Sequence, residues 1–228
     1  MNHKLFKRLV AVLMVGIMLL GTLSGAMPVA AAGEFSAAFA NDYAEVGVPM
    51  TLDVQGASGT ISYRWTVDGT AVGSGSSYTP TENDLMKWIR VTVSSGSDTA
   101  ELEMFFSLLP VVYINTEGGQ AITSKEKYID AELIVQGNSV YNSETTKLYN
   151  GLTEIRGRGN STWGQPKKPY RLKLDKKTDL LGMGKSKHWV LLANYLDESL
   201  QRNTLAYNLS GAMGMEQCST VFVDVILN

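Results

Sequence analysis

The basic residues of this chain are concentrated in one short segment, between Arg156 and Trp189. This segment contains half of the 20 lysines and arginines of the chain but only two acidic residues, Asp175 and Asp179. Such a concentration of positive charge creates a local potential that attracts phosphate groups, whatever fold lies beneath it. The basic residues are Arg156, Arg158, Lys167, Lys168, Arg171, Lys173, Lys176, Lys177, Lys185 and Lys187.

Residues 169–175 alternate strictly between apolar and polar side chains. A period of two predicts a strand with one buried and one polar face. Arg171 and Lys173 then project together from the polar face, while Leu172 and Leu174 point into the core.

A second predicted strand, Leu152–Arg156, leads into a turn in which Arg158 lies between Gly157 and Gly159. Glycine permits backbone conformations and close approaches that other residues resist. A strand, a glycine-rich turn and a strand with a projecting lysine form the arrangement expected of a nucleotide-phosphate cradle. The same pattern also fits a basic hairpin at the rim of an ordinary sheet, and the pattern alone favours that second interpretation.

Two better-known phosphate motifs are absent: the Walker loop, and the kinase glycine-rich loop, whose third glycine would lie at position 162 and here lies at 164. A Walker loop ending in Gly184, Lys185 and Ser186 would need glycine at position 179, where this chain has aspartate.

Catalytic and metal sites built on cysteine and histidine are also excluded, since Cys218 is the only cysteine and His188 the only histidine outside the first 32 residues. The chain therefore cannot form an internal disulfide, and it lacks the ligands of a zinc site. We expect no metal ligands in it, and we expect Cys218 to be buried as a small apolar residue.

The segment after Tyr195 has the pattern of a helix over residues 198–213, with Asp197 as its N-cap. Its apolar residues lie three and four positions apart and predict a core-facing stripe, with Arg202 on a different face. A final strand is expected at 220–227. The stripe consists of Leu205, Leu209, Ala212 and Met213.

Residues 1–32 have the three parts of an export signal. Lys4, Lys7 and Arg8 precede an apolar run at 9–20, and three alanines end at Ala32. We therefore expect a secreted, extracellular protein that is cleaved near Ala32. No later segment approaches the ~18 apolar residues of a membrane helix, so no transmembrane segment is expected after cleavage.

Residues 33–107 contain short alternating runs separated by turn residues, such as Asp68 and Gly69. Closely spaced short strands predict a β-sandwich. The runs around Trp65 resemble bacterial immunoglobulin-like modules, in this case without a disulfide, so Trp65, Tyr78 and the aliphatic residues must form the core. This resemblance implies a spacer or adhesion module that contacts cell-surface protein or carbohydrate.

Six motifs from Leu109 onward resemble the spore coat protein H (CotH) kinase family, in the family's order. The resemblance implies an α+β fold class, in which an all-β immunoglobulin-like sandwich precedes the mostly-β N-terminal lobe of an atypical kinase, incomplete at 108–228. It also implies use of ATP with Mg²⁺ or Mn²⁺ to phosphorylate serine or threonine. The motifs are 109–116, 155–161 (Ile-Arg-Gly-Arg-Gly-Asn-Ser), 168–174 (Lys-Pro-Tyr-Arg-Leu-Lys-Leu), 181–183, 189–195 (Trp-Val-Leu-Leu-Ala-Asn-Tyr) and Arg202-Asn203.

With this resemblance, Lys173 is the leading candidate for a phosphate contact, because a kinase-like lobe holds phosphates with a central strand lysine. Arg158 comes second, and Arg156, Arg171 and Arg202 complete the candidate nucleotide-phosphate site. No stretch matches the family's catalytic and metal-binding acids, so the catalytic residues are unknown and are expected C-terminal to Asn228.

The sequence therefore leaves three functional hypotheses. The first is a secreted bacterial CotH-type kinase, here an N-terminal fragment, that acts on extracellular or spore-coat proteins. The second is a secreted binding or adhesion protein with a degenerate kinase-like lobe. The third, nucleic-acid binding, conflicts with export and with the net charge of −2, so no nucleic-acid partner is expected.

Overall fold

The computed structural model describes residues 34–138 and 149–228. They form two compact units: the first comprises residues 34–108 together with Asn138, and the second comprises residues 109–137 and 149–228. Both units consist mainly of strands, and the described residues contain one α-helix, α2. The predicted export signal and residues 139–148 of the connection between β8 and β9 lie outside the described residues. In the described part of the chain, no helix is long and apolar enough to cross a lipid bilayer.

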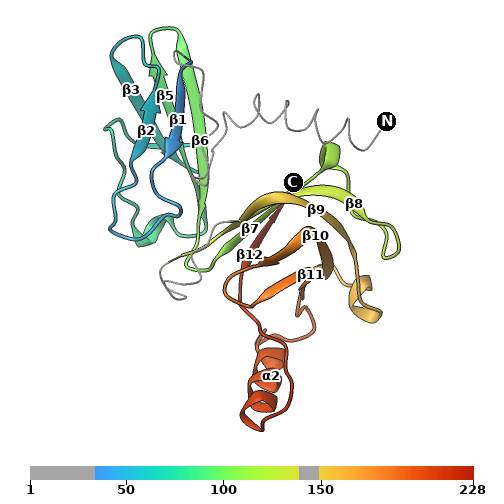
Figure 1. Ribbon diagram of the computed structural model, residues 1–228. Coiled ribbons are helices and arrows are strands. Elements are labelled where there is room, and N and C mark those ends of the chain that lie inside the picture. The colour runs from blue at the N-terminus through green and yellow to red at the C-terminus, as the bar shows by residue number, and fades with distance from the viewer. Residues whose placement is uncertain (1–33, 139–148) are drawn as a thin grey trace. The chain divides into compact units, whose positions relative to one another are not determined.

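The first unit contains a two-stranded antiparallel sheet, β1-β2, and a four-stranded antiparallel sheet in the order β4-β3-β5-β6 (Figure 1). Side chains from both sheets belong to one buried cluster, so the arrangement is sandwich-like. The strands are β1 (Ser36–Phe39), β2 (Leu52–Gln55), β3 (Ile61–Val67), β4 (Thr70–Gly73), β5 (Lys87–Ser95) and β6 (Asp98–Phe106).

Trp65 is the centre of this core and is fully buried. Its ring stacks on Tyr78 at 5.8 Å between centroids and lies 6.4 Å from the ring of Phe39 in β1. Its indole Nε1 donates a hydrogen bond to the carbonyl oxygen of Gly75 at 2.9 Å, which satisfies the one polar atom of the buried ring. The predicted role of Trp65 and Tyr78 in the core is confirmed.

A hydrogen-bond network on Asp84 fixes Tyr78 at the edge of this core. The Oδ2 atom of Asp84 accepts hydrogen bonds from the Tyr78 hydroxyl at 2.9 Å and from the backbone N–H of Thr81 at 2.7 Å. Burial, followed by the bond to Asp84, raises the pKa of Tyr78 to about 12. The phenol is therefore neutral at physiological pH and donates a hydrogen bond to the carboxylate.

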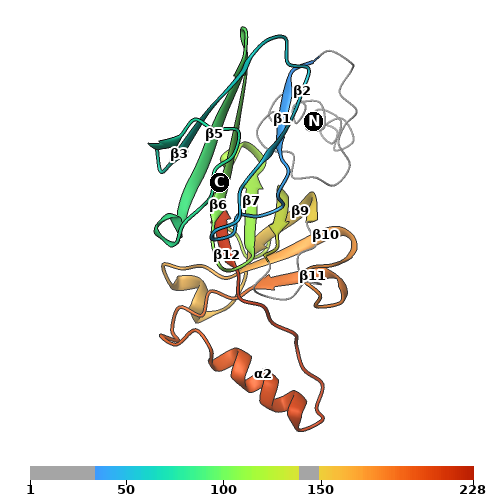
Figure 2. The same ribbon diagram turned by 90° about the vertical axis from the view of Figure 1, so that its left-hand side faces the viewer.

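The second unit is built on a six-stranded sheet in the order β11-β10-β9-β8-β7-β12 (Figure 2). Neighbouring strands are antiparallel except for β12, which pairs in parallel with β7. One face of the sheet is apolar, and Ile114, Leu133 and Ile155 from its central strands are completely buried. The strands are β7 (Val111–Thr116), β8 (Ile129–Gln136), β9 (Tyr149–Gly157), β10 (Tyr170–Asp179), β11 (Lys185–Leu191) and β12 (Asp224–Leu227).

The last strand is shorter than its apolar pattern predicts. We expected residues 220–227, but β12 comprises only Asp224–Leu227, because these four residues are the ones that pair with β7. Val221 and Val223 nevertheless pack against the core cluster of the second unit. Alternation before Asp224 therefore reflects contact with the core without strand pairing.

The helix α2 (Arg202–Ala212) starts four residues later than predicted and differs from the prediction in what it buries. None of its residues is buried, and the expected core-facing stripe is exposed: 68% for Leu205, 59% for Leu209 and 66% for Met213. Figures 1 and 2 show α2 standing away from the sheet. The predicted burial of this stripe is wrong.

The contacts of α2 explain the exposed stripe, because its more polar side faces the protein. The hydroxyl of Thr220 donates a hydrogen bond to the Thr204 hydroxyl at 3.3 Å. At the penultimate residue of the helix, a Cβ on Gly211 would overlap the side chain of Gln217. Cys218, in this same returning segment, is exposed, so its predicted burial is also wrong.

Candidate functional site

The strands β9 and β10 place three of the five predicted site residues on one face of the sheet. In their antiparallel register Arg171 pairs with Arg156, and Lys173 pairs with Glu154. Leu172, between the two cations of β10, is 2% exposed and points into the core. The predicted alternation of this strand is therefore confirmed, and Arg156, Arg171 and Lys173 share its polar face.

Lys173 forms an ion pair across the two strands. Its Nζ lies 2.7 Å from Oε2 of Glu154, and the two side chains are 40% and 35% exposed. The hydrogen bond to Glu154, reinforced by the charge of that carboxylate, raises the pKa of Lys173 above its usual value. Lys173 is thus a permanently charged lysine whose amino group is held in place by an acid on the neighbouring strand.

Arg156 is held by the segment that precedes β8. Its guanidinium lies over the ring of Tyr128 at 4.9 Å and donates a hydrogen bond to the carbonyl oxygen of Lys125. The Nζ of Lys173 lies 5.6 Å from the same ring, so Tyr128 contacts both cations. The Nε atoms of Arg156 and Arg171 are buried and have no hydrogen-bond partner among the described residues.

The glycine-rich turn after β9 is closed by an aromatic side chain from the following short helix. A Cβ on Gly157 would lie inside the ring of Trp163, so only glycine lets the indole cover the end of β9. Gly159 has a φ of +86°, and a Cβ there would overlap the hydroxyl of Thr162. Both glycines are therefore required by close contacts within residues 157–163.

Trp163 is itself held by residues that lead into β10. Its ring meets Tyr170 edge-on at 6.2 Å between centroids, and the Nζ of Lys168 lies 5.4 Å from the ring centroid. The same Nζ donates a hydrogen bond to the carbonyl oxygen of Trp163 at 2.8 Å. The turn is thus packed from both sides, which gives it a defined shape.

Arg158 lies inside this turn. Its backbone N–H donates to the carbonyl oxygen of Pro169 at 3.2 Å, and the next carbonyl, of Gly159, accepts a bond from Lys125 Nζ at 3.2 Å. These bonds fix the backbone on both sides of Arg158. No hydrogen bond or ion pair within the described ranges restrains its guanidinium, which leaves the group available to an anion.

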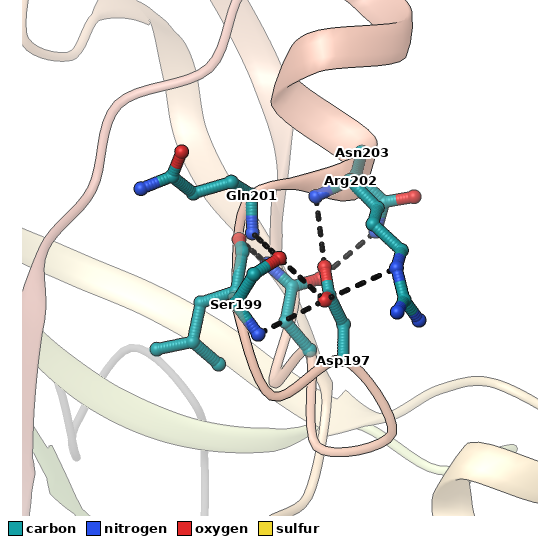
Figure 3. Close-up of polar contacts among 7 residues, drawn as sticks. Asp197, Ser199, Gln201, Arg202 and Asn203 are labelled. Atoms are coloured by element: carbon teal, nitrogen blue, oxygen red, sulfur yellow. Dashed lines mark hydrogen bonds and ion pairs between the residues drawn. The ribbon is translucent and has the colours of Figure 1, made fainter.

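Arg202 belongs to a different cluster, at the start of α2 (Figure 3). Its Nε lies 3.6 Å from Oδ1 of Asp197, and its side chain is 77% exposed. Oδ2 of Asp197 accepts a hydrogen bond from the backbone N–H of Arg202 at 2.8 Å, and Oδ1 accepts bonds from the backbone N–H and hydroxyl of Ser199. The N-cap of the helix is Gln201, so the predicted N-cap role of Asp197 is wrong, although the Asp197 carboxylate accepts a hydrogen bond from the backbone N–H of the first helical residue.

The loop that carries Asp197 is tied to α2 by a pair of asparagines. Asn203 Nδ2 donates to Asn194 Oδ1 at 2.9 Å, and Asn194 Nδ2 donates to the carbonyl oxygen of Leu200 at 3.1 Å. The bonds from Ser199, with the backbone N–H of Arg202 next, lower the pKa of Asp197. Among the described residues, no hydrogen bond or ion pair of this cluster reaches Arg156, Arg171 or Lys173, so the structure does not join Arg202 to the other four candidates.

The basic segment does not form a purely basic surface. The register of β8 places Asp130 opposite Glu154 and Glu132 opposite Leu152, on the same polar face as Lys173. Burial raises the pKa of Glu132. Sequence reasoning missed these acids because it counted charges along the chain. The pairing of Lys173 with Glu154 could have been found by aligning the two strands across the turn.

The described residues do not offer a site for a divalent metal ion. Across residues 34–138 and 149–228, no group of three or more aspartate, glutamate, histidine or cysteine side chains could hold one. The anionic part of a nucleotide fits better. The amino group of Lys173 and the unrestrained guanidinium of Arg158 are donors suited to phosphate oxygens, and Arg156 and Arg171 add positive charge on the face of Lys173.

Residues 155–228 match the family model of CotH kinase protein. The match begins within β9, at the residue before Arg156, and includes all five predicted site residues and α2. It does not include β7 or β8, so the predicted family strand at 109–116 stays a prediction.

Two further comparisons give little more. No match is found among curated proteins. Among solved structures, the full ectodomain of mouse nectin-like molecule 4 (Ig1–Ig3) is similar, with 11% identity and a TM-score of 0.22. The similarity covers 69% of this chain and 63% of the ectodomain, so this chain spans less than two thirds of that protein.

Proposed function

We propose that the second unit is the nucleotide-binding part of a secreted CotH-type protein kinase, which transfers phosphate from ATP to serine or threonine of extracellular or coat proteins. The observation that carries this proposal is the match of residues 155–228 to the CotH kinase model. The ion pair between Lys173 and Glu154 supports it independently. A strand lysine oriented by a carboxylate is a recurring element of kinase phosphate sites.

In this proposal each residue has a defined task. Lys173 binds phosphate oxygens, and Glu154 holds its amino group in position, as a partner on a rigid neighbouring strand can. Arg171 and Arg156 supply additional positive charge on the same face. Arg158 binds from the glycine-rich turn, where Trp163 and the bonds to Pro169 and Lys125 fix the backbone. ATP, when bound, supplies the phosphoryl group.

The family resemblance also implies Mg²⁺ or Mn²⁺ as a cofactor. Because the described residues lack a suitable group of ligands, we assign no step to a metal ion and name no catalytic acid. Export, with action at the cell surface or spore coat, is part of the proposal and rests on the sequence of residues 1–32 alone. The sandwich would then serve as a spacer or as a contact to surface protein or carbohydrate.

One observation also favours a second candidate function. Lys173 is already neutralised by Glu154, and a cross-strand pair of this kind stabilises many sheets without binding anything. The chain would then be a secreted binding or adhesion protein whose kinase-like unit binds no nucleotide. A single binding experiment separates the two candidates.

The experiment is isothermal titration calorimetry, in which ATP with Mg²⁺ is titrated into the full chain and into two lysine variants, and the binding free energies are compared. Lys173→Ala should weaken binding by roughly 1.5–3 kcal/mol, because it removes a charge-assisted phosphate contact. Lys176→Ala removes an exposed lysine from the same strand and should cost well under ~1 kcal/mol. Circular dichroism checks that both variants keep the sheet. Equal small losses, or no binding by the wild type, would support the second candidate.

A further inference from the structure

The segment from Ser124 to Tyr128 leads into β8 and contacts three parts of the proposed phosphate site. Its first part fixes the glycine-rich turn. The carbonyl oxygen of Ser124 accepts a hydrogen bond from the backbone N–H of Gly157 at 2.8 Å, and Nζ of Lys125 donates to the carbonyl oxygen of Gly159 at 3.2 Å. These two bonds hold the backbone on either side of the arginine between the two glycines.

The end of the same segment holds two cations of the site. The ring centroid of Tyr128 lies 4.9 Å from the guanidinium carbon of Arg156 and 5.6 Å from Nζ of Lys173. The carbonyl oxygen of Lys125 accepts a hydrogen bond from the same guanidinium. Like charges on neighbouring strands repel each other. A ring whose quadrupole attracts both cations lowers the cost of keeping them close together.

The segment has a local structure of its own, which does not depend on the cations. The hydroxyl oxygen of Ser124 accepts hydrogen bonds from the backbone N–H groups of Glu126 at 3.0 Å and of Lys127 at 2.9 Å. A serine that accepts bonds from residues two and three positions later stabilises a tight turn. Tyr128 follows this turn and directly precedes β8, which pairs with β9. The ring is therefore anchored from both sides at a defined place.

We propose that Tyr128 is a positioning residue for phosphate binding, whose ring holds Arg156 and Lys173 together so that both meet one polyphosphate. The inference rests on the proposed nucleotide site, and it adds a residue outside the 155–228 match to the CotH kinase model. A second carboxylate in place of the ring would cancel more of the positive charge that Glu154 already reduces. An aromatic face attracts the cations and leaves their charge available to the ligand.

The first test is calorimetry of ATP with Mg²⁺ binding to the full chain and to three variants. Tyr128→Leu removes the ring but keeps an apolar side chain, and it should weaken binding about twofold to thirtyfold, the range of cation–π contacts. Tyr128→Phe keeps the ring and should stay within about twofold of the wild type. The matched control is Tyr195→Leu, since Tyr195 is 46% exposed and its ring contacts no cation among the described residues. This control should bind ATP as the wild type does.

The second test separates attraction by the ring from simple packing. Pentafluorophenylalanine at position 128 keeps a ring of similar shape but withdraws the negative charge from its face. It should weaken ATP binding to about the same extent as Tyr128→Leu, whereas a packing role predicts binding like that of Tyr128→Phe. This variant also serves if circular dichroism shows that Tyr128→Leu does not keep the sheet.

The third test needs no ATP. The ring current of Tyr128 displaces the NMR signals of the Lys173 ε-methylene group, which the loss of a signal in Lys173→Arg identifies. Tyr128→Leu should move these signals toward the position of an ordinary exposed lysine, and Tyr128→Phe should not.

The outcomes distinguish this inference from the proposed function. A wild type that binds ATP, beside Tyr128→Leu and pentafluorophenylalanine variants that bind it equally well, would overturn the inference and leave the proposed function intact. Lys173 signals that do not respond to Tyr128→Leu would overturn it in the same way. A wild type that binds no ATP would refute the proposed function, and with it the inference that rests on it.

Discussion

The strand β10 and the helix α2 carry equally regular apolar patterns, but only the strand buries them. Leu172 and Leu174 of β10 are 2% and 1% exposed, because β9 and β11 flank the strand and a core lies beneath it. Leu205 and Leu209 of α2 are 68% and 59% exposed. Periodicity determines which residues share a face of an element. It does not determine whether another part of the same chain covers that face.

The largest effect that would sharpen this comparison is expected from truncation of matched leucines. Leu172→Ala removes a buried side chain from the core and should lower the free energy of unfolding by about 2–5 kcal/mol. Leu205→Ala removes the same atoms from an exposed position and should change it by less than about 0.5 kcal/mol. Urea unfolding monitored by circular dichroism measures both changes. Equal losses would mean that α2 is buried in solution.

Sequence reasoning succeeded where the neighbouring residues along the chain supply the answer. The polar face of β10 follows from alternation within seven residues, and Trp65 was identified as a core residue from its place in an alternating run. The helix was found for the same reason, but its N-cap is Gln201 and not the predicted Asp197. Its first residue was misplaced because the loop from Asn194 to Leu200 makes its own turn, in which both of these residues have positive φ.

The rest depends on contacts between distant segments. Glu154 meets Lys173 only through strand register, and Tyr128 reaches Arg156 only because β8 lies beside β9. The packing of the Trp163 ring against Gly157 depends on the path of the chain between β9 and β10. The pattern within a single strand reveals none of these contacts, and only the pair of Lys173 and Glu154 could have been found, by aligning β9 and β10 across the turn between them. Arg202 was grouped with the strand cations from the order of family motifs, and motif order does not measure distance.

An intermediate effect is expected at the aromatic closure of the glycine-rich turn. Gly157→Ala introduces a methyl group into the space of the Trp163 ring and should destabilise the second unit by about 1–3 kcal/mol, as overpacking does. The matched control is Gly164→Ala, since a Cβ at Gly164 has nothing within 4 Å. The double variant Gly157→Ala with Trp163→Ala removes the overlap. If the double variant is no more stable than the sum of the two single changes predicts, the Trp163 ring does not pack against Gly157.

The smallest expected effect is a pH-dependent loss of local stability in α2 alone. Hydrogen bonds from Ser199 and from the backbone N–H of Arg202 lower the pKa of Asp197. The ionised carboxylate therefore stabilises the folded state fully above the ordinary aspartate pKa of ~3.9. This stabilisation is lost as the pH falls through the lower pKa that Asp197 has in the folded protein. Amide hydrogen exchange should therefore show α2 losing protection below about pH 4, while the strands of the same unit keep theirs. Asp197→Asn should make α2 exchange faster at neutral pH and remove this acid transition, whereas Glu198→Gln, at an exposed neighbouring acid, should change neither. Unchanged exchange in Asp197→Asn would show that the Asp197 carboxylate does not stabilise the helix. The contrast between a strand fixed by its sheet and a helix fixed by this carboxylate, by the Asn194–Asn203 hydrogen bond and by the segment that follows it would then fail.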